Sequence, residues 1–291
     1  MRNAFIEELI ALATVHSHIA LVVGDLGFST IEPFADLFPD RFINAGVAEQ
    51  NMTGLAAGMA SEGYHVFTYS IANFPTFRCA EQIRNDIDYH NLPVTVVSVG
   101  GGLAYGALGY SHHAIQDYAL MRVFPNMMIA SPGDPLEVRA CLRYLVEHPQ
   151  PSYLRLGKSG EPVFHEVVPS LEPGRWLKIS PGTSPQTFLS TGTALSLAMS
   201  RRSRAEFAGF AVHSLPLWGM KFKQSQVEQS EAWTRIITVE DHLRDAGFGS
   251  WCREAIGESS RGPRIESVAL SSEVFGKVGS QATLNDIGGL I

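Results

Sequence analysis

The chain has 291 residues, of which 45% are apolar, a composition typical of a globular protein and not of a disordered or collagen-like chain. The formal net charge of −7, from 22 Lys and Arg against 29 Asp and Glu, disfavours binding of nucleic acid or anionic lipid through bulk charge. No apolar run is long enough to span a bilayer, so we expect a soluble, cytoplasmic protein with neither a nucleic-acid nor a membrane partner.

The first half of the chain alternates between helical and strand patterns. Strands are predicted at residues 20–23, 41–44, 65–69, 94–99 and 153–156. Apolar residues at helical spacing from Met52 to Ala60 predict a helix, which Gly63 ends. Another helix is predicted over residues 76–89. Asp134 and Pro135 are a typical N-cap and first-turn pair for a helix that continues to about residue 145.

The pattern changes after the strand at 153–156. Residues 158–185 hold five prolines and little periodicity, which indicates a linker that we place at 161–185. Beyond it, strands are predicted at 187–189, 209–212, 235–239 and 265–268, with a helix at 248–256.

This alternation predicts the fold class. Strands that alternate with helices form mostly parallel sheets with helices on both faces. We therefore expect an α/β protein with two such domains, residues 1–160 and 186–291, joined by the linker. Cys79, Cys141 and Cys252 form no CxxC pair, so we expect buried thiols in a reducing compartment rather than disulfides or a zinc site.

Motifs of several common enzyme classes are absent from the sequence: there is no P-loop, complete dinucleotide-binding glycine motif, nucleophile elbow or HExxH zinc motif. Three other groups lie beside predicted strand ends or helix starts: Glu49, the pair Phe74 and Phe77, and residues 111–113, which are Ser-His-His. In open α/β sheets ligands bind beyond the carboxyl ends of the strands. These groups are therefore candidates for one functional site.

Several segments carry a resemblance to a known family. They are RFINAGVAEQNM at 41–52, FPTF at 74–77, LGYSHH at 108–113, PNM at 125–127, SPGD at 131–134 and TVEDH at 238–242. In this order they resemble the pyrimidine-binding domain and the C-terminal domain of thiamine-diphosphate enzymes, above all transketolase and deoxyxylulose-phosphate synthase. The resemblance covers nearly the whole chain.

One part of the family pattern is missing. Full-length transketolases begin with a domain that binds diphosphate and Mg²⁺ through a GDG…N motif, whereas Gly24-Asp25 here has no matching Asn downstream. The chain thus resembles the C-terminal half of a split transketolase. The resemblance implies a transferase that is active only with an N-terminal subunit holding the diphosphate and the Mg²⁺ ligands. It also implies two copies of each chain and self-association through the pyrimidine-binding domain.

The resemblance assigns four residues to the cofactor. Thiamine diphosphate needs a carboxylate at N1′ of its aminopyrimidine, and Glu49 matches that position. Without the family pattern, Glu49 would be interpreted as an acid in the first turn of a helix. Phe74 and Phe77 match residues that enclose the pyrimidine, although their spacing also suits core packing. Asp25 matches an acid near the cofactor.

The resemblance assigns five residues to the substrate. His112 matches the histidine that contacts the donor ketose near its reacting oxygens, and His113 replaces a Gln. Arg2, Ser29 and Arg155 match positions that bind the sugar phosphate, for which the arginine fork is well suited. The two histidines remain open to interpretation as a surface pair, and Arg2 as a solvated residue at the chain start.

The sequence departs from the family pattern at a position that binds substrate. Leu108 replaces a substrate-binding Asp, which suggests an altered sugar. We expect transfer of a two-carbon ketol unit between a ketose and an aldose, both as sugar phosphates. Two alternatives remain: a subunit that acts on pyruvate, similar to deoxyxylulose-phosphate synthase or a 2-oxo-acid dehydrogenase β subunit, and a non-catalytic partner subunit.

Overall fold

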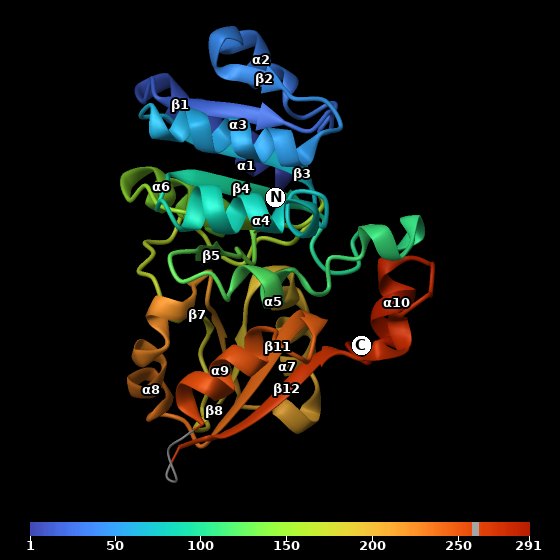
Figure 1. Cartoon of the computed structure of the whole chain (residues 1–291). Helices are drawn as coiled ribbons and strands as arrows, with labels where there is room; N and C mark the ends of the chain where they lie inside the picture. Colours follow the sequence, from blue (N-terminus) through green and yellow to red (C-terminus); the bar gives the residue numbers. More distant parts are fainter. Residues whose placement is uncertain (258–261) are drawn as a thin grey trace.

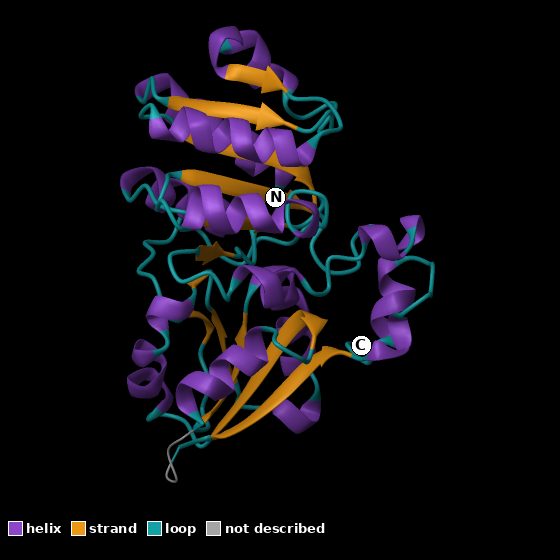
Figure 2. Ribbon diagram, in the orientation of Figure 1, coloured by secondary structure: helices purple, strands orange, loops and turns teal. Residues whose placement is uncertain are grey.

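The computed structural model of the chain describes residues 1–257 and 262–291. Two α/β lobes lie one above the other, the upper formed by the N-terminal part of the chain and the lower by the C-terminal part (Figure 1). Each lobe contains one sheet with helices packed beside it (Figure 2). Within the part of the chain that is described, no helix combines the length and apolar character needed to cross a membrane.

The upper lobe is built on a seven-stranded sheet with the order β10-β5-β6-β4-β3-β1-β2. Its strands are β1 (Ile19–Val23), β2 (Phe42–Asn44), β3 (His65–Ile71), β4 (Val94–Val99), β5 (Met128–Ala130), β6 (Ser152–Leu156) and β10 (Leu217–Trp218). Neighbouring strands pair in parallel except β10, which comes from the C-terminal part of the chain and pairs antiparallel with β5. The two lobes therefore share backbone hydrogen bonds.

Helices cover both faces of this sheet. They are α1 (Arg2–Val15), α2 (Glu32–Leu37), α3 (Glu49–Ser61), α4 (Ala80–Gln82), α5 (Asp117–Met121) and α6 (Pro135–Glu147). Leu21 and Val23 of β1 pack in one core cluster with residues of α1 and α6, whereas Val22 packs with residues of α3 on the other side. Successive strand side chains point to opposite faces, so a continuously apolar strand serves both layers.

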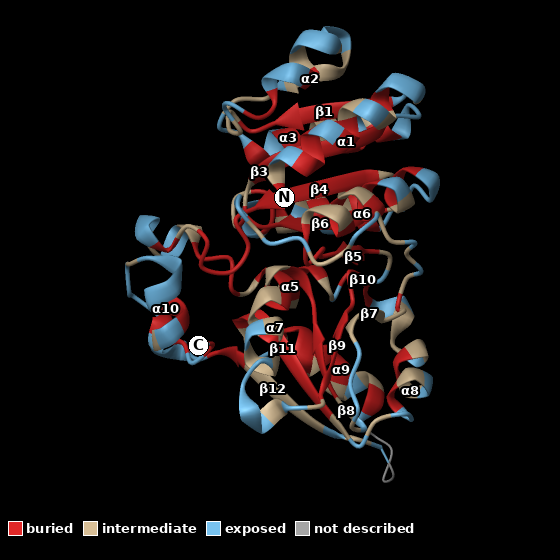
Figure 3. Ribbon diagram, turned by 180° about the vertical axis from the view of Figure 1, so that it is seen from behind, coloured by how far each residue is buried: buried red, intermediate tan, exposed pale blue. Residues whose placement is uncertain are grey.

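The lower lobe has a five-stranded sheet with the order β12-β11-β8-β9-β7. Its strands are β7 (Leu177–Ser180), β8 (Gln186–Ser190), β9 (Ala211–Ser214), β11 (Arg235–Leu243) and β12 (Arg264–Leu270), and its helices are α7 (Leu195–Arg202), α8 (Gln224–Ser230), α9 (Phe248–Ile256) and α10 (Gln281–Ile287). Among the described strands of this lower sheet, only the edge strand β7 runs antiparallel to its neighbour. Buried residues concentrate in the central strands of both sheets (Figure 3).

The fold class is confirmed as two mostly parallel sheets with helices on both faces. The helix expected at 76–89 forms as three joined pieces, the 3₁₀ helix η2 (Phe77–Cys79), α4 and the π-helical η3 (Ile83–Asp88). The linker expected at 161–185 contains β7, so it is not free of regular structure. Edge strands such as β7 and β10 are short and depend on distant partners, and no local periodicity marks them.

Candidate active site

Glu49 lies at the carboxyl ends of β1 and β3. It is the first residue of α3 and is only 1% exposed. A Cβ atom on Gly24, the residue after β1, would lie 3.6 Å from Cγ of Glu49 and 3.5 Å from Oγ of Ser70 on β3. The strand β1 pairs with β2 on one side and with β3 on the other, so the strands that follow β1 are added first on one side of it and then on the other. The carboxyl end of β1 is therefore the topological switch point of the sheet. Ligands of open α/β sheets bind at such points.

The carboxylate of Glu49 has one protein partner among the described residues. Nη1 of Arg78 donates a hydrogen bond to its Oε2 at 2.6 Å. Its Oε1 is buried and, within the same residues, has no hydrogen-bond partner. The guanidinium of Arg78 also lies over the ring of Phe74, 4.7 Å from the centroid. Sequence reasoning missed Arg78, although it directly follows the FPTF segment.

Aromatic side chains line the region next to Arg78, the partner of Glu49. The rings of Phe74 and His112 meet edge to face with centroids 5.3 Å apart. A cavity of about 380 Å³ is lined by Asn73, Phe74, Phe77, Arg78, Tyr110, Ser111 and Gln116. Phe77 is exposed at its rim. The structure therefore brings Glu49, Phe74, Phe77 and His112 into one region, with Arg78 linking the first two.

The two adjacent histidines lie in different environments. His112 is half-buried, and its Nδ1 shares a 3.0 Å hydrogen bond with Oγ of Ser111. Burial, with a smaller contribution from the charge of His113, lowers the pKa of His112, which favours a neutral ring. His113 is fully buried, and its Nε2 donates to the carbonyl oxygen of Gly106 at 3.2 Å. The structure gives no support to the expected contact of His113 with substrate, because its ring packs inside the loop.

Arg155 is also not available to a phosphate. It is buried, and its Nε donates to Asp117 and its Nη1 to Asp241, both at 2.6 Å. Its Nη2 donates to the carbonyl oxygen of Ala114 at 2.8 Å. Two carboxylates thus compensate one cation, and every guanidinium nitrogen has an acceptor. The structure therefore gives no support to the expected phosphate contact of Arg155, and its acidic partners were not evident because they are distant in sequence.

The loop after β1 carries two of the predicted residues. Asp25 has a positive φ of 56° and accepts a hydrogen bond from Nδ2 of Asn44 at 2.9 Å. Ser29 is exposed with a φ of 65°, and its N–H donates to Oε1 of Glu32 at 2.7 Å. Non-glycine residues rarely adopt this conformation, and they concentrate at functional sites. Both residues lie at the same sheet edge as Glu49.

Near the N-terminus of α1, the side chain of Arg2 contacts the backbone of a second basic residue, Lys158. Nε of the half-buried Arg2 donates to the carbonyl oxygen of Lys158 at 3.2 Å. Nζ of Lys158 lies 5.3 Å from the ring centroid of Tyr105, and that ring is 6.5 Å from the ring of His112. Lys158 was not predicted from the sequence, although its position two residues after the predicted strand at 153–156 could have indicated it.

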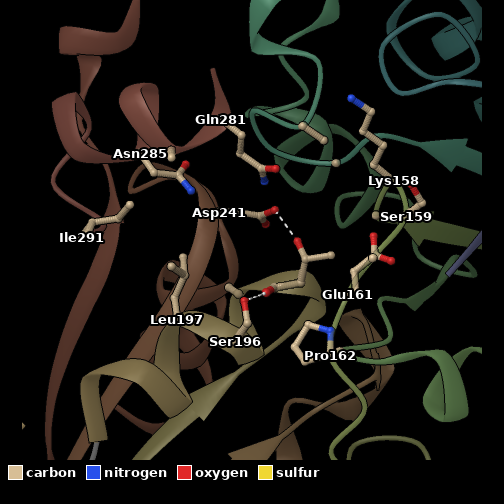
Figure 4. A pocket seen from close by; sticks show the side chains of 18 of the residues that line it. Lys158, Ser159, Glu161, Pro162, Ser196, Leu197, Asp241, Gln281, Asn285 and Ile291 are labelled. Atoms are coloured by element: carbon tan, nitrogen blue, oxygen red, sulfur yellow. Dashed lines mark hydrogen bonds between the residues drawn. The ribbon is translucent and has the colours of Figure 1, made fainter. Parts of the chain in front are cut away.

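A larger cavity of about 520 Å³ lies between the lobes (Figure 4). Oγ1 of Thr193 donates to Asp241 at 2.8 Å on its wall. Asn285 is 7% exposed and its amide is directed into the cavity, and its Oδ1 has no hydrogen-bond partner within residues 1–257 and 262–291. Of the described residues that line this cavity, none was predicted as a site residue. Lys158 lies on its wall and, through the ring of Tyr105, also borders the region around His112.

The chain is similar to known proteins along nearly its whole length. The family model "Transketolase, pyrimidine binding domain" matches residues 1–161. One subunit of the apulose-4-phosphate transketolase of Phocaeicola vulgatus is 32% identical over 94% of this chain and 89% of its own length. A putative transketolase C-terminal section of Methanocaldococcus jannaschii is 31% identical over 96% of this chain and 88% of its own. A solved structure described as a split gene transketolase, inactive beta4 tetramer, has a TM-score of 0.84 at 32% identity and covers 99% of this chain and 93% of that one.

Proposed function

This chain belongs to the transketolase family as a counterpart of its C-terminal half, and we propose that it supplies the pyrimidine side of the active site in a two-subunit, thiamine-diphosphate-dependent transketolase. The reaction is transfer of a two-carbon ketol unit from a ketose to an aldose. The observation that carries the proposal is the buried Glu49 carboxylate at the carboxyl edge of the sheet, with one oxygen left without a partner among the described residues.

The residues around Glu49 fit the aminopyrimidine of thiamine diphosphate. Buried polar atoms almost always have a hydrogen-bond partner, so an Oε1 that has none among the described residues is suited to a ligand that brings one. When bound, thiamine diphosphate supplies the nucleophilic carbon that carries the two-carbon unit. Glu49 holds and exchanges a proton with the ring nitrogen N1′ through Oε1. Phe74 and Phe77 pack against the pyrimidine, and Asp25 lies near the cofactor in the loop after β1.

The substrate occupies the region beyond Phe74. The half-buried His112, whose pKa is lowered mainly by burial, donates a hydrogen bond to the reacting oxygens of the donor sugar. Arg2, Lys158 and Ser29 bind the phosphate end of the sugar, with Lys158 in place of Arg155. A similar protein is named for apulose 4-phosphate, which supports a phosphorylated substrate here. Leu108 in place of the family Asp alters the contacts of the sugar hydroxyls.

The proposed assembly has two copies of this chain and two of an N-terminal partner that holds the diphosphate and Mg²⁺. The similar beta4 tetramer is described as inactive, which supports the need for a second kind of subunit. Helix α3 contributes four small residues to a shallow surface cavity: Gly54, Ala57, Gly58 and Ser61. The same cavity is also lined by Asp86, His90 and Leu92. Small side chains permit close approach of two helices, so we propose that copies of this chain associate through α3.

Reconstitution with the N-terminal partner tests the proposal. We expect Glu49→Gln to reduce ketol transfer between a ketose phosphate and an aldose phosphate by about 10²–10⁴-fold, the usual contribution of a positioned acid or base. Circular dichroism and assembly should not change. Glu62→Gln, at the exposed end of α3, is the matched control.

The same assay separates the alternatives. Full activity of Glu49→Gln would show that Glu49 does not activate the cofactor. Decarboxylation of pyruvate without ketol transfer would favour an enzyme similar to deoxyxylulose-phosphate synthase. Tight cofactor binding with no turnover of any donor would favour a non-catalytic partner subunit.

A further inference from the structure

Arg78 contacts both groups that the proposed function assigns to the pyrimidine ring. Its Nη1 donates to Glu49 at 2.6 Å, and its guanidinium lies on the face of Phe74 at 4.7 Å. A guanidinium is planar, donates N–H groups and stacks on aromatic rings. An aminopyrimidine has the same three properties. The side chain of Arg78 therefore stands where a pyrimidine ring would make its own contacts.

Arg78 reaches Glu49 from the mouth of the site. Its side chain is 47% exposed, whereas that of Glu49 is 1% exposed. The backbone of η2, which carries Arg78, is held by the N–H of Cys79 donating to the carbonyl oxygen of Thr76 at 3.0 Å. Oγ1 of Thr76 in turn donates to the carbonyl oxygen of Ala72 at 3.0 Å. The guanidinium can thus move into solvent by side-chain rotation alone, without a change in the fold.

The contact stabilises the chain when no cofactor is bound. A buried carboxylate without a counter-charge is strongly unfavourable, because burial removes its hydration. Arg78 supplies that counter-charge from the solvent side. A pyrimidine ring that packs on the face of Phe74 covered by Arg78 must displace the guanidinium, whereas Oε1 of Glu49 is already without a partner among the described residues.

We propose that Arg78 is a self-inhibitory placeholder for the pyrimidine ring in the unassembled chain, and that cofactor binding requires its displacement. This inference rests on the proposed function, since it takes Glu49 and Phe74 as the pyrimidine contacts. Its consequence is that the chain alone binds the pyrimidine weakly, and binds it better once Arg78 is removed. In the assembled enzyme, the contacts of the partner with the diphosphate drive the displacement.

Thiamine is the probe, because it carries the pyrimidine without the diphosphate. It would be titrated into the purified full chain and followed by ligand-observed NMR. We expect Arg78→Met to bind thiamine at least tenfold tighter than the wild type, and this gain to vanish in the Glu49→Gln background. Arg84→Met is the control, since Arg84 is exposed on the same helical segment and donates to the side chain of its neighbour Asn85.

Two results would overturn the placeholder role. In the first, the wild type and Arg78→Met bind thiamine equally well, and Glu49→Gln weakens binding in both. This result would exclude the placeholder role and leave the proposed function intact. Binding that is independent of Glu49 in every variant and in the assembled enzyme would overturn both proposals.

Thermal unfolding supplies a second readout that needs no ligand. We expect Arg78→Met to lower Tm by about 2–4 °C in the wild-type background and by much less in Glu49→Gln, where no charge is buried. Additive shifts in the double variant would show that the two side chains do not depend on each other, and would contradict the proposal.

Discussion

The guanidinium of Arg155 donates a 2.6 Å hydrogen bond to the carboxylate of Asp241, and this buried ion pair joins the two lobes of the molecule. Arg155 belongs to β6 of the upper sheet and Asp241 to β11 of the lower one. Asp117 binds the same guanidinium through Nε, and the ring of Tyr118 stacks on it at 4.4 Å. A residue expected to bind substrate is therefore a structural link between the lobes.

We expect Arg155→Met to lower the free energy of unfolding by about 3–5 kcal/mol, because it leaves two buried carboxylates without their cation. Urea denaturation followed by tryptophan fluorescence measures the change. Arg175→Met is the control, since Arg175 pairs with Glu172 at the surface and should contribute less than about 1 kcal/mol. Equal effects of the two substitutions would contradict the linking role.

Gly102 leaves no room for a side chain beside Asp241, and its backbone has a left-handed conformation. Its φ is +65°, and a Cβ atom there would lie 2.5 Å from Oδ2 of Asp241. Gly289 has a φ of +79°, and a Cβ atom there would meet no described atom within 4 Å. Gly289→Ala should cost about 1–2 kcal/mol through the left-handed backbone alone. Gly102→Ala should cost about 1–3 kcal/mol more through overpacking, and denaturation of both variants tests this difference.

Glu240 should make stability depend on pH near neutrality. Burial raises its pKa to about 8, although the N–H groups of Phe248 and Gly249 bond to its carboxylate at the start of α9. The unfolded chain loses this proton near pH 4.5, whereas the folded chain keeps it to about pH 8, so stability falls as the pH rises through this interval. The contribution is about 1.4 kcal/mol per pH unit.

Glu240→Gln isolates this contribution, because an amide does not titrate. The free energy of unfolding would be measured from about pH 5 to pH 8, the interval over which the two states differ in bound protons, in the wild type and the variant. The variant should have a flatter profile, whatever its mean stability. Parallel profiles would show that Glu240 is ionised throughout the interval.

Phe74 should matter more for cofactor affinity than Phe77. Phe74 is half-buried between Arg78 and His112, whereas Phe77 is 47% exposed at the rim. An aromatic contact contributes about 0.5–1.5 kcal/mol beyond area burial, so Phe74→Leu in the assembled enzyme should weaken thiamine diphosphate binding by about 2–10-fold. Phe77→Leu should have a smaller effect. Calorimetric titration of both variants checks the order, and a larger effect at Phe77 would reverse it.

Local patterns in the sequence were sufficient for most of the fold. The helix predicted at 248–256 is observed as Phe248–Ile256, and Asp134 caps α6 by accepting hydrogen bonds from the N–H groups of Leu136 and Glu137. These features depend on residues within one or two helical turns of one another. Strand β10 was missed because its pairing with β5 joins residues far apart in the chain.

The sequence by itself determined the alternation of strands and helices, the family resemblance and the grouping of Glu49, Phe74 and His112, since spacing and short motifs carry them. Only the tertiary structure decided which side chains are available to a ligand. Arg155 finds Asp117 and Asp241 at separations of 38 and 86 residues, and Arg78 finds Glu49 at 29. Charges separated so far along the chain meet only after the sheets and helices have packed, so their pairing depends on the whole fold.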